Sequence, residues 1–210
     1  MKKSIASLIL AGTVFSSVVF ANSCKKENLE GKSSSPDYYS HFIAYEGKRN
    51  KVYDPNPNDG KHEPTIGVGH YLDDPNSKES FKNALPEVDY MLVYSKKKKL
   101  TDEQVKKLFD YDLAKKINDA KEAFDNFDSY PNYLKIALVD GFYRGDLKKS
   151  PKTQELIRQG KFYEASIEYL NHKEYKNAKK NKMRGVFNRM NSNSKAMLKY
   201  SKENKTTTEK

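Results

Sequence analysis

A short run that begins at Glu46 constrains the fold more than any other part of the chain. Residues 37–46 place apolar side chains at roughly helical spacing, and Gly47 follows as a natural C-terminal cap. Residues 51–53 and 65–68 are short and strand-like, and the turn between them is rich in Asn, Asp, Pro and Gly. This order predicts a helix that leads directly into a small β-hairpin.

The remainder of the chain is patterned as helix. A capping-box motif at 101–104 precedes a long apolar face, and residues 133–142 read as a buried helix. Further helices are expected at 151–160, where Pro begins and Gly ends the segment, at 162–170 and at 193–200. The predicted fold class is therefore α+β, mainly α, with a small β-hairpin lobe and a larger helical lobe.

The N-terminus has the organisation of an export signal. A charged start is followed by an apolar, uncharged stretch, so residues 1–21 are predicted to be a signal peptide. Cys24, the only cysteine, follows in a loose match to a bacterial lipoprotein box. Removal of 1–23 with lipidation of Cys24 is thus an alternative to plain secretion, and a retained signal-anchor is a third. The chain is expected to be secreted, periplasmic or lipid-anchored at the cell envelope.

Three further segments follow. Residues 22–36 are polar and read as a linker. Residues 37–200 form the expected globular domain, and 201–210 read as a frayed polar tail.

The formal net charge is +11 over 210 residues. A basic surface favours anionic partners such as nucleic acid, anionic lipid or a bacterial wall. The lysines are scattered over many segments and no nucleic-acid motif is present, so a nucleic-acid partner is not expected. The other histidines show no ligand spacing with His70, so neither a metal nor a cofactor is expected.

Two carboxyl groups stand close together in unlike local settings. Glu46 falls at the end of an apolar helix, where partial removal from water favours the neutral form that a general acid needs. Asp54 lies on the adjacent turn, where it can act as a base or simply cap the turn. Thr65, on the returning strand, offers a hydroxyl that can orient water or merely fill a strand position. Two carboxyls of this kind are what glycosidic-bond hydrolysis requires.

The same residues resemble the phage-type lysozymes, glycoside hydrolases of the T-even bacteriophage kind. That family has Glu-Gly at the end of its first helix, then Tyr and Asp, then Thr-Ile-Gly-x-Gly-His. In this chain Glu46-Gly47, Tyr53, Asp54 and residues 65–70 match in order. The resemblance extends over about 36–200. Weaker matches lie at 101–112, 137–145, 156–165 and 184–189.

The resemblance implies a lysozyme-like fold and an inverting muramidase that acts on peptidoglycan. Glu46 would protonate the leaving oxygen, and Asp54 would activate water with the help of Thr65. It also implies a structural ion pair between His70 and Asp112. A membrane would be involved only through the N-terminus, and a monomer is expected.

The match departs from the family around the second carboxyl. The family usually has one residue between Tyr and Asp, whereas Tyr53 and Asp54 are adjacent here, and the following turn is longer. Asp59 therefore stays an alternative base.

The substrate-binding positions also differ. Where the family often has Asn or Gln facing the cleft, this chain has Tyr143 beside Arg144. The family has a late Arg in contact with the catalytic Glu, and both Arg184 and Arg189 fit that place.

Two alternatives to a muramidase stay open. One is a catalytically inactive peptidoglycan-binding lipoprotein of the same fold. The other is an enzyme that acts on chitin or another amino-sugar polymer.

Overall fold

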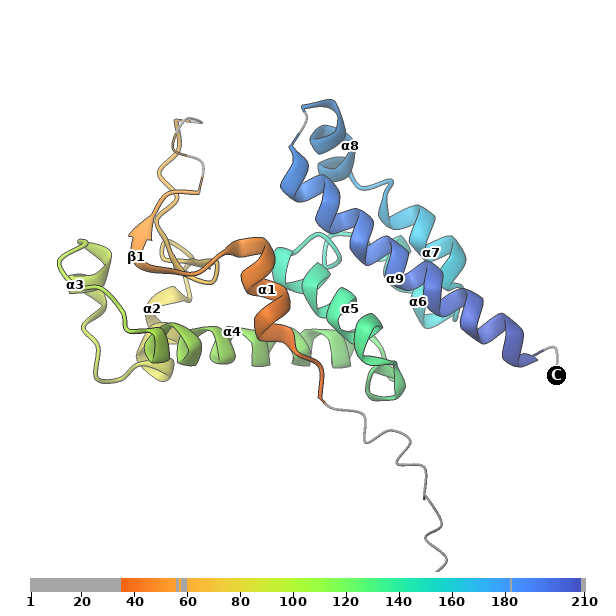
Figure 1. Ribbon diagram of the computed structural model, residues 1–210, viewed down its shortest axis with the longest axis horizontal. Helices are drawn as coiled ribbons and strands as arrows, with labels where there is room; N and C mark the ends of the chain where they lie inside the picture. The colour runs from red at the N-terminus through yellow and green to blue at the C-terminus, as the bar shows by residue number, and fades with distance from the viewer. Residues whose placement is uncertain (1–34, 56, 58–59, 182, 209–210) are drawn as a thin grey trace, which may run out of the picture. The chain divides into compact units, whose positions relative to one another are not determined.

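The computed structural model describes residues 35–55, 57, 60–181 and 183–208. The expected signal peptide, Cys24, most of the expected linker and Asp59 lie outside these residues. The described chain is mainly helical with a small three-stranded antiparallel sheet, which confirms the predicted α+β, mainly α, class (Figure 1). Within it, no helix combines the length and apolar character that a bilayer crossing requires.

The first helix, α1 (Tyr38–Glu46), is closed at both ends by local chemistry. The Asp37 carboxylate accepts a hydrogen bond from the Ser40 amide at 3.1 Å, which satisfies an amide of the first turn. Gly47 follows with φ +69°, and its amide donates to the Ile43 carbonyl at 2.9 Å. The helix therefore stops at Glu46, as the sequence predicts.

The sheet has the order β1-β2-β3, and both pairings are antiparallel. Tyr53 stands opposite Thr65 across the first pairing, and Ile66 stands opposite His70 across the second. The register of β1 and β2 shifts between the ends of β1, as at a β-bulge. The strands are β1 (Arg49–Tyr53), β2 (Thr65–Gly67) and β3 (His70–Tyr71).

The later part of the described chain is helical. Its elements are α2 (Ser77–Ala84), α3 (Tyr90–Tyr94), α4 (Asp102–Ala123), the short 3₁₀ helix η1 (Phe127–Ser129), α5 (Asn132–Arg144), α6 (Pro151–Arg158), α7 (Phe162–Tyr169), α8 (Lys173–Lys180) and α9 (Arg184–Thr208). The helices expected around 133–142, 151–160 and 162–170 are confirmed as α5, α6 and α7. The capping box before α4 is also present: Gln104 N–H donates to the Thr101 hydroxyl, and Thr101 N–H donates to the Gln104 amide oxygen.

Several elements differ from the sequence prediction. The strand β3 and the helices α2, α3 and α8 were not expected, because each is short or carries few apolar residues. The last helix begins nine residues before the predicted 193 and continues to Thr208. The part of the expected polar tail from 201 to 208 is therefore helical. Within this part of α9, Ser201 is buried and residues 202–204 are exposed.

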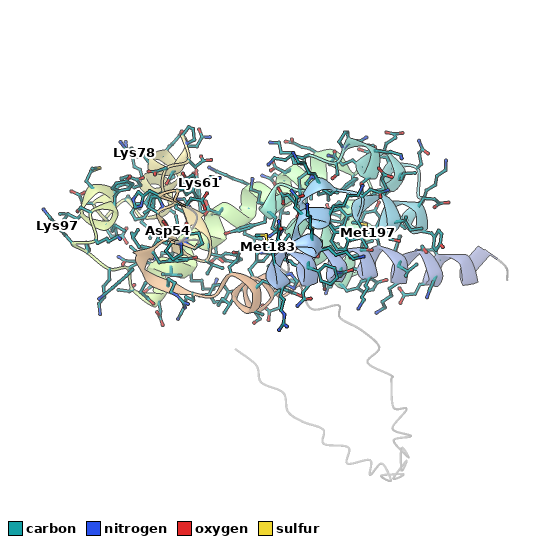
Figure 2. The ribbon with its side chains drawn as sticks, turned by 90° about the horizontal axis from the view of Figure 1, so that it is seen from above. Asp54, Lys61, Lys78, Lys97, Met183 and Met197 are labelled. Atoms are coloured by element: carbon teal, nitrogen blue, oxygen red, sulfur yellow. The ribbon has the colours of Figure 1, made fainter. Side chains whose placement is uncertain are left out.

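Two long helices organise the core. Helix α4 contacts all three strands and α2, and it also contacts α5 (Figure 1). The strands with α2 and α3 are called the β side below, and α5 to α9 are called the helical side. Helix α4 joins the two. Helix α9 packs along α5, α7 and α8. In Figure 2, Asp54 and Lys97 lie among the β-side elements, whereas Met183 and Met197 lie at α9. Phe42 of α1 is fully buried and contacts the rings of Phe109, on α4, and Tyr143, on α5.

Candidate active site

Glu46 is held from two sides. Its carboxylate accepts a hydrogen bond from Nη1 of Arg189, on α9, within an ion pair. On the other side it packs against Gly69, where an added Cβ would stand only 3.4 Å from the Glu46 carboxyl carbon. Gly69 has φ +82°, a backbone region that favours glycine. The Glu46 side chain keeps 26% exposure, so the carboxyl is fixed in position and still open to solvent.

Arg189 faces two carboxylates at once. Its Nε donates to Asp140 Oδ1 at 2.7 Å, while Nη1 donates to Glu46. Nη2 lies 2.6 Å from the same Asp140 oxygen, out of line for a hydrogen bond, and is the one buried side-chain N or O in the described chain without a hydrogen-bond partner. Burial alone would lower the pKa of Arg189, but Asp140 and Glu46 more than offset this and raise it. Arg189 is therefore a permanent cation behind Glu46.

Asp140 is the buried counter-charge of this arrangement. It is fully buried on α5 and, besides the Arg189 contact, accepts a hydrogen bond from Asn193 at 2.7 Å. His41 Nε2 lies 3.4 Å from its Oδ1. Desolvation acts to raise the pKa of Asp140, but His41, Arg189 and Asn193 outweigh it, so the pKa lies below the ordinary value. Asp140 is thus ionised at neutral pH and holds Arg189 in place.

The polar network continues into the helical side. Asn193 also donates to the Tyr169 hydroxyl at 3.3 Å, and that hydroxyl donates to Asp146 at 2.7 Å. Burial raises the pKa of Asp146, although Tyr169 and Arg144 act to lower it. Arg144 Nε donates to Asp146 at 2.9 Å, and its Nη2 reaches Glu174 at 3.3 Å. Arg144, expected at the substrate, is therefore engaged with these two carboxylates.

The side chains of Asp54 and Thr65 both form hydrogen bonds with the backbone of Glu63. Asp54 follows β1 and accepts a hydrogen bond from the Glu63 amide at 3.3 Å, while His62 Nδ1 lies 3.9 Å away. The hydroxyl of Thr65, which is buried, donates to the Glu63 carbonyl at 3.0 Å. Because the hydroxyl proton is used in this way, the Thr65 oxygen would serve a water molecule as an acceptor.

Tyr53 connects this turn to Glu46. Its pKa is raised, first by desolvation and then by the negative charge of Glu46, while Arg49 acts in the opposite direction. Tyr53 is also the register partner of Thr65. The strand pairing therefore places Thr65 opposite the residue whose pKa responds to the charge of Glu46.

His70 and Asp112 are brought together as the family resemblance implies. His70 Nδ1 lies 2.7 Å from Asp112 Oδ2, and Nε2 lies 2.8 Å from the Ser77 hydroxyl. Both ring nitrogens are thus used inside the protein, and His70 is buried. His70 therefore links β3 to α4 and α2.

Tyr143 likewise joins the two sides of the protein. Its hydroxyl donates to the Val68 carbonyl at 2.6 Å. Burial raises the Tyr143 pKa well above its ordinary value, and the charges of Asp112 and Glu46 add to the effect. Gly69, His70, Asp112 and Tyr143 share the wall of a pocket of about 280 Å³. Tyr143 therefore lies near Glu46, with its hydroxyl committed to the fold.

Of the two late arginines, the structure brings Arg189 to Glu46. Arg184 is exposed at the start of α9 and makes no hydrogen bond or ion pair within the described residues. Sequence reasoning missed Asp140 and Asn193 as the groups behind Arg189. The signal for Asp140 was its place in the run Leu138-Val139-Asp140-Gly141-Phe142, because a carboxylate amid buried apolar residues needs a charged partner.

No three His, Cys, Asp or Glu side chains gather as a metal site in the part of the chain that the structure describes. No known protein-family model matches the chain, and no curated protein matches it with significant similarity.

Proposed function

We propose that the protein is a muramidase that hydrolyses the β-1,4 bond between N-acetylmuramic acid and N-acetylglucosamine in peptidoglycan. The main support for this proposal is the position of the Glu46 carboxyl and its contacts. This carboxyl ends α1, is held between Arg189 and the backbone at Gly69, and stays partly open to solvent. A fixed, reachable carboxyl is what a general acid for a glycosidic oxygen needs.

The proposed reaction inverts the anomeric carbon. Glu46 gives its proton to the leaving glycosidic oxygen as the bond to the anomeric carbon breaks. A water molecule attacks that carbon from the opposite face, and Asp54 takes the proton that the water loses. Thr65 orients the water by accepting one of its hydrogens, because the Thr65 hydroxyl already donates to Glu63. An inverting enzyme holds its two carboxyls about 6.5–9.5 Å apart to leave room for this water.

Peptidoglycan as the substrate rests on the resemblance at Glu46-Gly47, Tyr53, Asp54 and 65–70. The net charge of +11 supports it, because bacterial walls are anionic. The expected signal peptide would take the protein to the cell envelope, where that substrate lies.

The test is digestion of purified peptidoglycan by the purified full chain, with chitin in parallel. The proposal expects new reducing ends on muramic acid, released first as the inverted anomer. Reducing ends from chitin alone would reassign the substrate to another amino-sugar polymer. A folded protein that binds the wall and releases no reducing ends would instead be the inactive binding lipoprotein.

A further inference from the structure

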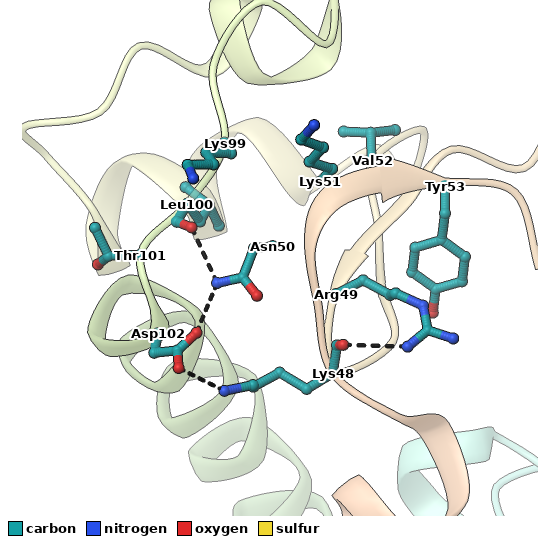
Figure 3. A pocket seen from close by; sticks show the side chains of 10 residues that line it. All are labelled: Lys48, Arg49, Asn50, Lys51, Val52, Tyr53, Lys99, Leu100, Thr101 and Asp102. Carbon is teal, nitrogen blue, oxygen red and sulfur yellow. Dashed lines mark hydrogen bonds and ion pairs between the residues drawn. The ribbon is translucent and has the colours of Figure 1, made fainter.

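A basic cavity lies beside β1. It has a volume of about 750 Å³ and opens between β1 and the segment that leads into α4. Five of the residues that line it carry charge: Lys48, Arg49, Lys51, Lys99 and Asp102 (Figure 3). Glu46 does not line this cavity.

Backbone and amide hydrogen bonds fix the walls. The Leu100 amide donates to the Asn50 carbonyl at 2.9 Å, and the Asn50 side-chain amide donates back to the Leu100 carbonyl at 3.0 Å. The same Asn50 nitrogen donates to Asp102 at 2.8 Å, at the first turn of α4. Figure 3 shows Asn50 between Leu100 and Asp102. Strand β1 and the segment at 99–102 therefore form a rigid frame for the longer basic side chains.

The charge of the cavity is not balanced from within. Four cations and one carboxylate line it. The Asp102 carboxylate is taken by Lys48, whose Nζ lies 2.7 Å away. Lys51 and Lys99 are exposed and form no ion pair with any described residue. The positive charges of Lys51 and Lys99 are therefore open to an anion that binds from solvent.

The positive surface extends beyond the cavity. Residues 96–99 are four consecutive lysines, all exposed, and Lys99 belongs to the cavity wall. Flexible lysines around an open cavity match a chain of repeated anionic groups better than one small anion, because no fixed fork geometry is offered. Phosphate is a strong acceptor for such groups.

The cavity offers little to a nucleic-acid base. Single-stranded nucleic acids are held by stacking of bases on aromatic rings. Tyr53 is the only aromatic residue in the wall, it is partly buried, and Arg49 stands over its ring at 5.9 Å from the centroid. We propose that the basic cavity binds a linear, phosphate-bearing polymer without bases, at a site distinct from Glu46. The placement of this polymer in a bacterial wall rests on the proposed function, whereas the binding itself does not.

The test compares two double variants of the full chain with equal charge. Lys51→Gln/Lys99→Gln removes two cavity charges, and Lys148→Gln/Lys149→Gln removes two exposed, unpaired lysines elsewhere. The probe is soluble inorganic polyphosphate, titrated at several salt concentrations. The cavity double variant is expected to bind at least tenfold more weakly and to lower the salt slope by about one to two. The control double variant is expected to stay within about twofold of the parent. An equal loss of polyphosphate affinity in both double variants would mean that only the net charge matters, and it would overturn the proposal.

Two further probes separate other occupants. Single-stranded DNA of equal phosphate count, bound more tightly than polyphosphate through Lys51 and Lys99, would replace the proposal with a nucleic-acid site. Binding to anionic vesicles that is tighter than binding to polyphosphate and is lost in Lys51→Gln/Lys99→Gln would assign the cavity to a lipid surface. Glu46→Gln should bind polyphosphate as the parent does. A failure of the muramidase proposal therefore leaves this result unchanged, and the reverse also holds.

Discussion

Arg189 is paired with Glu46 across 143 positions of the sequence. The pair joins the last residue of α1 to α9, and Asp140 on α5 holds the same guanidinium from behind. Three helices thus meet at one cation. The position of the proposed general acid therefore depends on the packing of the whole helical side.

Substitution of Arg189 should measure how much a buried, unpaired Asp140 lowers the free energy of unfolding. Arg189→Gln leaves Asp140 fully buried with no full cationic partner, so the free energy of unfolding should fall by about 3–5 kcal/mol. Arg189→Gln/Asp140→Asn removes the unpaired charge as well and should recover part of that loss. Urea unfolding of the parent, both single variants and the double variant measures the coupling. Additive losses would show that the two residues are not coupled.

The two buried aspartates of the network should have opposite effects on acid stability. The pKa of Asp140 is lowered, so its stabilisation is complete above the ordinary Asp value of about 3.9 and is lost as the pH falls through the lower folded-state value. The pKa of Asp146 is raised, so the folded state takes up its proton first and gains stability as the pH falls.

Urea unfolding between about pH 6 and pH 2.5 tests these signs. Asp140→Asn should make the fall of the unfolding free energy with decreasing pH shallower than in the parent, and Asp146→Asn should make it steeper. A change of the same sign in both variants would contradict the assignment.

Two alanine substitutions can separate the effect of crowding Glu46 from the effect of a side chain at positive φ. Gly69→Ala and Gly160→Ala both place a Cβ at positive φ, at +82° and +71°, and should each cost about 1–2 kcal/mol. Only the Cβ at Gly69 would meet Glu46, whereas nothing lies within 4 Å of the one at Gly160. Peptidoglycan hydrolysis should therefore fall on the order of 10- to 100-fold in Gly69→Ala alone. Equal activity of the two variants would mean that the Glu46 position tolerates this displacement.

The Tyr143 hydroxyl should matter for the junction between α5 and the sheet. Tyr143→Phe leaves the Val68 carbonyl without this donor, at a cost of about 1–3 kcal/mol to the free energy of unfolding. Tyr94→Phe is the control, because its hydroxyl bonds to the exposed Asp73 and should cost less than about 1 kcal/mol. Thermal and urea unfolding compare the two. A smaller loss of unfolding free energy in Tyr143→Phe than in Tyr94→Phe would show that the Tyr143 hydroxyl does not stabilise this junction.

Much of the fold could be predicted because local rules act at its boundaries. Gly47 after Glu46 and the Thr101–Gln104 capping box set helix ends through bonds within a few residues. Short elements escaped prediction because tertiary contacts stabilise them. Strand β3, for example, has two residues and exists through its pairing with β2.

The candidate site was predictable only in part. The motif around Glu46 is compact in sequence, so its members could be named from spacing. Arg189 and Arg184 could not be separated, because which face of α9 meets α1 is decided by packing over long sequence distances. Arg144 was expected at the substrate but has buried Asp146 as its partner, and nothing local in the sequence marks that pair.

The most direct measurement is the release of reducing ends from purified peptidoglycan by the parent, Glu46→Gln and Glu122→Gln. Glu122 is an exposed residue of α4 and provides the same chemical change away from the site. We expect activity in the parent and in Glu122→Gln, and a loss of about 10²- to 10⁴-fold in a folded Glu46→Gln. Activity that survives in Glu46→Gln at the parent level would contradict the role of Glu46 as the general acid.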